Sequence, residues 1–141
     1  MSDISTPQLD AALGYLILRT TLGLNIFIYG LSRIISGPAN FANSLIPMFE
    51  HTFLPADLVY LFGLCLLWAE AVVGGLNLVG LCTRYALIVG AFLILNLTFG
   101  ATLRQDWESA GLQLIYVAIY AALLALSEYN RFSVDAYFLT K

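Results

Sequence analysis

Charged residues, cysteine and histidine are scarce in this sequence of 141 residues. Asp, Glu, Lys and Arg make up 11% of it, whereas a typical soluble domain carries roughly a quarter. So little charge cannot cover a soluble globule of this size, and six Lys and Arg spread along the chain form no basic patch for nucleic acid. Two cysteines are too few for a secreted disulfide scaffold. A single histidine excludes a haem held by two histidines.

Apolar residues, in contrast, are abundant and form long runs. Hydrophobic residues account for 60% of the chain, and its mean hydropathy is +0.85. One bilayer crossing takes about 20 apolar residues, and the runs predict four crossings, over about 11–35, 57–81, 85–103 and 109–127. The runs lack the period-two alternation of barrel strands. They therefore predict an all-α, integral membrane four-helix bundle, with residues 1–141 as a single transmembrane domain.

The segments outside the spans give the topology. The first connection contains Pro38, Pro47 and Pro55, and its Phe-rich part from Phe41 to Phe53 predicts a short helix at the membrane interface. The next two connections are so short that spans two, three and four must be antiparallel neighbours. The aromatic tail after Ser127 is expected to lie on the membrane surface or against a partner.

The basic residues are divided unevenly between the two sides of the predicted bundle. Arg84, Arg131 and Lys141 lie on the side of the termini, and Arg33 and Arg104 lie on the other side. The excess of basic residues favours cytoplasmic termini. We expect an integral protein of a bacterial or organellar inner membrane.

Ionisable residues inside a span are the first candidates for function, because each costs roughly 2.5–3.5 kcal/mol at the bilayer centre. Glu70 lies near the middle of the second span and Arg19 lies within the first. Each shares a helical stripe with glycines, which lets another helix approach and turns the polar group toward protein. We therefore take Glu70 and Arg19 as candidate catalytic residues. The alternative is that the pair serves only to hold two helices in register.

An apolar slot lined by aromatic rings and a few polar groups suits a quinone. The candidate quinone-binding residues are Arg84, Tyr29, Asn77, Tyr116 and Tyr120. In this hypothesis Glu70 handles a proton, and Arg19 or Arg84 stabilises charge on the reduced quinone. The alternative for the tyrosines is an ordinary interfacial belt or helix packing.

Neither a metal nor a disulfide is expected. His51 with the adjacent Glu50 makes a poor set of ligands, and a solvated loop histidine is the simpler interpretation. Cys65 and Cys82 are about 25 Å apart along one helix, whereas a disulfide needs Cα atoms within about 7 Å.

Three segments of the chain form an ordered pattern. From Glu70 onward, the second span contains several glycines and leads into a Gly-Leu-x-Thr-Arg turn that ends at Arg84. The first span carries Arg-x-x-x-Gly…Phe-x-x-Gly from Arg19 to Gly30, and the tail has Ser-Val-Asp at 133–135. In order and spacing these segments resemble the DoxX/DoxD-like membrane proteins. Tyr29 departs from the histidine common there, and Glu-Tyr-Asn at 128–130 departs from Gly-Pro-Gly.

The resemblance implies a four-helix membrane protein. In some members it implies the membrane subunit of thiosulfate:quinone oxidoreductase, and in others a part of thiol-redox and oxidative-stress complexes. Two hypotheses follow: a quinone-linked redox subunit acting in thiosulfate or thiol oxidation, or a non-catalytic accessory subunit packed against a larger membrane complex. Expected partners are lipid and other membrane subunits. A transporter is disfavoured because neither an internal repeat nor a broken helix is present.

Overall fold

Four long helices and four short ones make up residues 6–139, the part of the chain that this computed structural model describes. Each of the four long helices is long and apolar enough to cross a membrane. The prediction of an all-α membrane bundle is thus confirmed. In chain order the elements are α1 (Thr6–Ile35), α2 (Pro38–Leu45), η1 (Ile46–Phe49), α3 (Ala56–Val79), α4 (Thr83–Leu103), α5 (Trp107–Ala125), η2 (Ser127–Tyr129) and α6 (Val134–Leu139).

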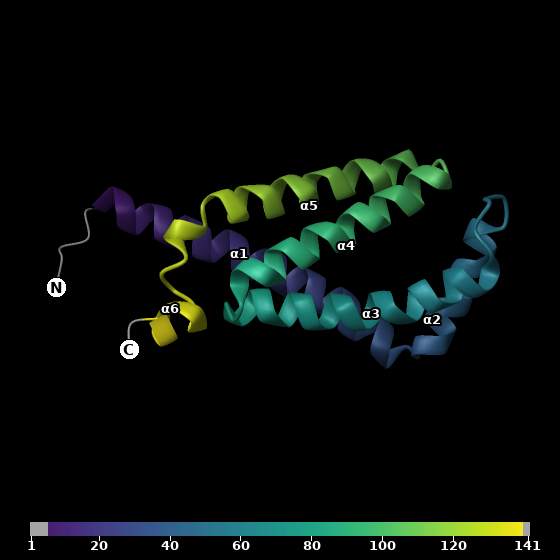
Figure 1. The fold of residues 1–141 in the computed structure, drawn as a ribbon, viewed down its shortest axis with the longest axis horizontal. Coiled ribbons are helices and arrows are strands. Elements are labelled where there is room, and N and C mark those ends of the chain that lie inside the picture. The colour runs from purple at the N-terminus through teal and green to yellow at the C-terminus, as the bar shows by residue number, and fades with distance from the viewer. Residues whose placement is uncertain (1–5, 140–141) are drawn as a thin grey trace.

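The long helices form two pairs. α1 packs mainly on α3, and α4 forms a hairpin with α5, whereas α1 and α5 touch only sparsely. Figure 1 shows the beginning of α1, the α3–α4 turn and α6 at one end of the bundle, with α2 toward the other end. The space between the two pairs holds the cavity described below.

Glycine sets how closely α1 and α3 approach and in which register. A Cβ on Gly30 would strike the backbone of Ala71, and a Cβ on Gly74 would strike the backbone of Phe27. Such backbone contact between helices needs residues without side chains. These two contacts show that α1 and α3 run antiparallel. The register that they fix decides which polar residues of the two helices meet.

The predicted short helix in the first connection is present, but it begins earlier and is docked on the bundle. α2 begins at Pro38, where a proline is favourable because the first helical N–H needs no partner. Ala42 of α2 is fully buried, and a Cβ on Gly63 of α3 would lie 3.0 Å from the Cα of Ala42. The small residues on both helices therefore explain the close packing of α2 on α3.

The tail also folds back onto the bundle, at the α3–α4 turn. The Asp135 carboxylate accepts hydrogen bonds from the backbone N–H groups of Cys82 and Thr83, each at 2.7 Å. The N–H of Asp135 donates to the carbonyl of Gly80 at 3.0 Å. Asp135 thus caps the beginning of α4 from a distant part of the sequence. The tail, predicted to lie on the membrane or on a partner, is anchored to its own chain.

Arg19 closes the same end of the bundle from inside. It is 1% exposed, and its guanidinium donates to the carbonyl of Asn77 in the last turn of α3 and, at 2.8 Å, to that of Phe132 in the tail. Gly80, at φ 73°, leaves room for the guanidinium, because a Cβ there would lie 2.6 Å from Arg19 Nη1. A cation at a helix C-terminus is favourable. We call Arg19, Gly80 and Asp135 with their partners the tail clamp.

The tail clamp predicts a pH-dependent stability. Burial opposes ionisation of Asp135, but the hydrogen bonds from Thr83 and Cys82 outweigh it and hold the pKa of Asp135 below its usual value. A lowered folded-state pKa contributes stability above the unfolded pKa of about 3.9, and this stability is lost as pH falls through the folded-state value.

Asp135→Asn should therefore lower the free energy of unfolding by about 1 kcal/mol at pH 7. The difference from the wild type should shrink below about pH 4. Unfolding of detergent-solubilised protein at both pH values measures this, with Asp10→Asn on the exposed beginning of α1 as the control. A deficit that does not change with pH would contradict the capping role.

Candidate functional site

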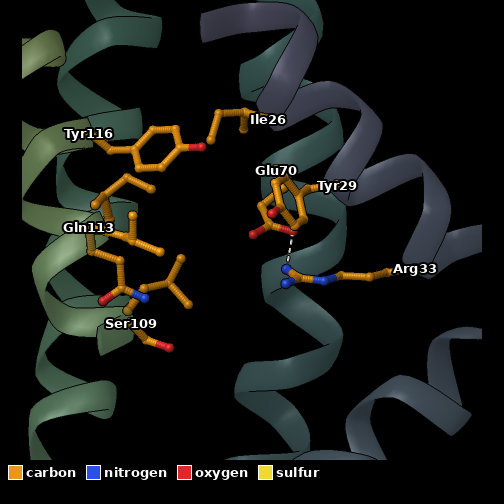
Figure 2. Close-up of a pocket in the computed structure, with 10 residues that line it drawn as sticks. Ile26, Tyr29, Arg33, Glu70, Ser109, Gln113 and Tyr116 are labelled. Atoms are coloured by element: carbon orange, nitrogen blue, oxygen red, sulfur yellow. Dashed lines mark hydrogen bonds and ion pairs between the residues drawn. The ribbon is translucent and has the colours of Figure 1, made fainter. Parts of the chain in front are cut away.

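A cavity of about 290 Å³ lies between the two helix pairs and contains Glu70. Figure 2 shows Glu70, Tyr29 and Arg33 on one side, and Tyr116, Gln113 and Ser109 facing them from α5. Its walls combine a few polar groups with an apolar majority, and its lining residues are Ile26, Tyr29, Arg33, Glu70, Ile94, Leu97, Ser109, Leu112, Gln113 and Tyr116.

On the α1–α3 side, Glu70 is held by an ion pair with Arg33. Glu70 is 3% exposed, and its Oε2 accepts a hydrogen bond from Nη1 of Arg33. The guanidinium of Arg33 lies 4.5 Å from the ring centre of Phe41 and 5.5 Å from that of Tyr29. Rings over a guanidinium attract it through their π faces. The aromatic residues thus hold Arg33 beside the buried carboxylate.

On the α5 side, Asp106 fixes the first turn of the helix. The Oγ and N–H of Ser109 donate to the Asp106 carboxylate at 2.7 and 3.1 Å. These hydrogen bonds hold the pKa of Asp106 below its usual value, and the bond from the Ser109 hydroxyl has the larger effect. The next turn presents Gln113, whose Oε1 is buried without a hydrogen-bond partner. A buried acceptor without a donor is costly, and the rest of the Gln113 side chain lines the cavity.

Tyr116 lies one turn further along α5, at the edge of the cavity. Its hydroxyl donates to Oδ1 of Asn25 on α1 at 2.9 Å. Among the predicted quinone-binding residues, Tyr29 and Tyr116 therefore share the cavity with Glu70.

The predicted pairing of Arg19 with Glu70 is wrong. Arg19 lies in the tail clamp, and Arg33 takes its place beside Glu70. The cause is the α1–α3 register: Gly30 lies on Ala71, so the following turn of α1 carries Arg33 to Glu70. Arg19, earlier in α1, reaches only the last turn of α3. Glu70 nevertheless has a cationic partner from the first span.

Three other predicted quinone-binding residues lie away from the cavity. Asn77 is fully buried, and its backbone carbonyl accepts from Arg19. Tyr120 is 1% exposed and packs on Gly90, where a Cβ would lie 2.5 Å from its hydroxyl. Arg84 is exposed in the first turn of α4 and lines a surface hollow with Asp135.

The sequence contained a signal for the residues that were missed. Arg33 belongs to the same stripe of α1 as Arg19, but its place at the end of the span suggested a side chain that reaches water. Gln113 lies on the polar stripe of α5 with Ser109 and Tyr116. Asn96, the polar residue in the middle of α4, lies away from the cavity and lines a hollow between α3 and α4 with Cys65.

The family model described as TQO small subunit DoxD matches residues 34–141. The chain belongs to the DoxD family. This membership confirms the resemblance seen in the sequence. The match covers α3, α4 and α5, and so includes Glu70 and Gln113, whereas Arg33 directly precedes it. No curated protein and no solved structure matches the chain. Within residues 6–139, no group of three His, Cys, Asp or Glu side chains is placed to hold a metal ion in this DoxD chain.

Proposed function

We propose that this DoxD-family chain is the membrane subunit of a quinone-linked redox system, and that the Glu70 cavity binds the quinone head group. One observation carries the proposal: the buried Glu70–Arg33 pair and the side chain of Gln113 line opposite walls of a cavity between the two helix pairs. The family description names a subunit of TQO, and thiosulfate or thiol oxidation is the reaction we propose for the system.

The cavity has the chemistry that a quinone head requires. Polar groups on opposite walls could meet the two ring oxygens, while Ile26, Ile94 and Leu97, which also line the cavity, would contact the ring. The amide of Gln113 has both a donor and an acceptor, so it can bond to a carbonyl and also to a hydroxyl. The volume of the cavity, about 290 Å³, lies just below the range for ligand pockets, roughly 300–1,000 Å³. It therefore suits a single ring.

When bound, a quinone would supply the capacity to accept two electrons and two protons. The protein's own residues would position the head and handle protons. Glu70 can hold a proton at its carboxylate, next to the ring oxygen. Arg33 would stabilise negative charge on that side, and Gln113 would hold the ring from the opposite wall.

Binding of a decyl-substituted benzoquinone to the protein in lipid nanodiscs tests the proposal. We expect saturable binding that Glu70→Gln and Gln113→Leu each weaken about 10-fold, equivalent to about 1.4 kcal/mol. Glu108→Gln, on the exposed first turn of α5, is the matched control and should bind as the wild type does. Absence of saturable binding to the wild type, or equal binding by all variants, would refute the proposal.

A second candidate function is that of a non-catalytic accessory subunit, and the tail clamp favours it. Arg19, Gly80 and Asp135 carry much of the family resemblance, yet they lie together at the end of the bundle with structural contacts only. Those motifs therefore describe a scaffold rather than a reaction centre. Gentle extraction separates the two functions: a larger partner co-purifying with a bundle that carries no quinone favours the accessory role.

We further propose that the protein lies in a bacterial or organellar inner membrane with cytoplasmic termini. The four apolar helices make it an integral membrane protein. The orientation is supported by Arg84 and Arg131, which line one hollow with Tyr15 in the first half of α1, and by Lys141, which follows in sequence.

A further inference from the structure

A second hollow, of about 300 Å³, lies along the seam between α1 and α5. It shares Leu112 and Tyr116 with the Glu70 cavity, so the two spaces adjoin. It has no charged residue, in contrast to the Glu70 cavity. We call it the seam groove, and its lining residues are Leu18, Thr21, Leu22, Asn25, Leu112, Ile115, Tyr116 and Ile119.

The seam groove opens toward lipid rather than toward water. Leu18 and Ile115, on its two walls, are 36% and 58% exposed, and both lie well inside helices that can span the membrane. Exposed side chains at that depth face the acyl chains of the bilayer. The sparse contact between α1 and α5 leaves the seam open. An aliphatic chain can therefore reach the groove directly from the hydrocarbon region.

We infer that the seam groove binds the aliphatic chain of an amphiphilic ligand whose head group occupies the Glu70 cavity. This inference rests on the proposed function for the identity of the head. The Glu70 cavity has room for a ring but not for a long substituent, so a chain must leave it. Leu112 and Tyr116, both uncharged, line both spaces, so a chain that leaves the cavity past these two side chains enters the groove.

The hydrogen bond between Tyr116 and Asn25 marks the boundary between the two spaces. It joins α5 to α1 where the charged cavity gives way to the uncharged groove. The bond fixes the width of the seam at this point. Tyr116 thus serves as a positioning residue between head and chain, with its ring against both.

The experiment compares two probes: the decyl-substituted benzoquinone and its chainless parent. Thr21→Trp places a large side chain in the seam groove, and Thr102→Trp, at an exposed threonine of α4, is the matched control. Each variant is compared with the wild type for the same probe, so that partitioning of the probe into lipid cancels. Thermal unfolding establishes that both variants are folded.

We expect Thr21→Trp to weaken binding of the decyl probe about 10-fold and to leave binding of the chainless parent unchanged. Thr102→Trp should change neither. A Thr21→Trp variant that binds both probes as the wild type does, or that weakens both equally, would overturn the groove assignment. In those cases the Glu70 cavity remains the binding site of the head group if Glu70→Gln weakens binding of the chainless benzoquinone. If the wild type binds neither probe, the proposed function fails as well.

A second measurement needs no variant. A decyl benzoquinone with a photoreactive group at the end of its chain should label the wild-type protein within residues 18–25 or 112–119. Labelling confined to other helices would overturn the inference even where the probe binds tightly.

Discussion

Replacement of Arg19 by alanine is expected to lower the free energy of unfolding by about 3 kcal/mol. The guanidinium is buried and donates to carbonyls of both Asn77 and Phe132. Its removal leaves these acceptors without a donor, at about 1–3 kcal/mol each, and also leaves a cavity. Arg19→Lys, which keeps the charge but cannot reach both carbonyls with a planar fork, should recover only part of the loss.

Unfolding in mixed micelles measures this effect, with Arg131→Ala as the control. Arg131 is an exposed residue of the tail, and its replacement should change stability by no more than about 0.5 kcal/mol. Trypsin gives a local readout, because loss of the Phe132 contact should speed cleavage after Arg131 in the Arg19→Ala protein. Quinone binding should not change, since Arg19 lies outside the cavity. Equal stability of the Arg19→Ala and wild-type proteins would contradict the tail clamp.

The helices could be predicted from the sequence because their signal is strong and local. Runs of about 20 apolar residues have few alternatives in a bilayer, and each run is interrupted by its own polar connection. The buried stripes were equally readable, since Gly23, Gly30 and Arg19 recur at helical spacing on one face. The stripe identifies which residues face protein, but it does not identify the partner that each one meets.

The partners could not be predicted, because they depend on how far α3 is shifted along α1. Arg19 and Arg33 lie on one stripe and are separated by about 21 Å of helix. Either arginine satisfies the requirement of Glu70 for a cation. Backbone contact at Gly30 and Gly74 determines which arginine pairs with Glu70. This contact depends on both helices together, so it cannot be predicted from the sequence of either helix alone. The long-range contact of Asp135 with the α3–α4 turn was unpredictable for the same reason.

The Glu70–Arg33 pair should be asymmetric in its response to mutation. Arg33→Ala leaves the buried Glu70 carboxylate without its cation, which should cost about 3–5 kcal/mol. Glu70→Ala should cost less, because the side chain of Arg33 is 24% exposed and its long stem lets the charge reach water. The double variant should therefore be more stable than Arg33→Ala alone, with a coupling energy of about 1–3 kcal/mol.

The free energies of unfolding of the wild type, the two single variants and the double variant, measured in mixed micelles, complete this double-mutant cycle. Arg104→Ala is the matched control. Arg104 also pairs with a carboxylate, that of Asp106 at 3.5 Å, and its guanidinium also lies over an aromatic ring. Arg104→Ala should cost less than Arg33→Ala, since that carboxylate keeps its hydrogen bonds from Ser109. Losses from Arg33→Ala and Glu70→Ala that simply add would mean that the two charges do not stabilise each other.

The same cycle separates a structural pair from a functional one when quinone binding is measured alongside stability. A pair that only holds α1 against α3 should regain both stability and binding in the double variant, because no unpaired charge remains. A pair that contacts the quinone head should regain stability while binding stays weak, since the groups next to the ring oxygen are still missing. We expect the second result, because Glu70 and Arg33 both line the cavity opposite Gln113.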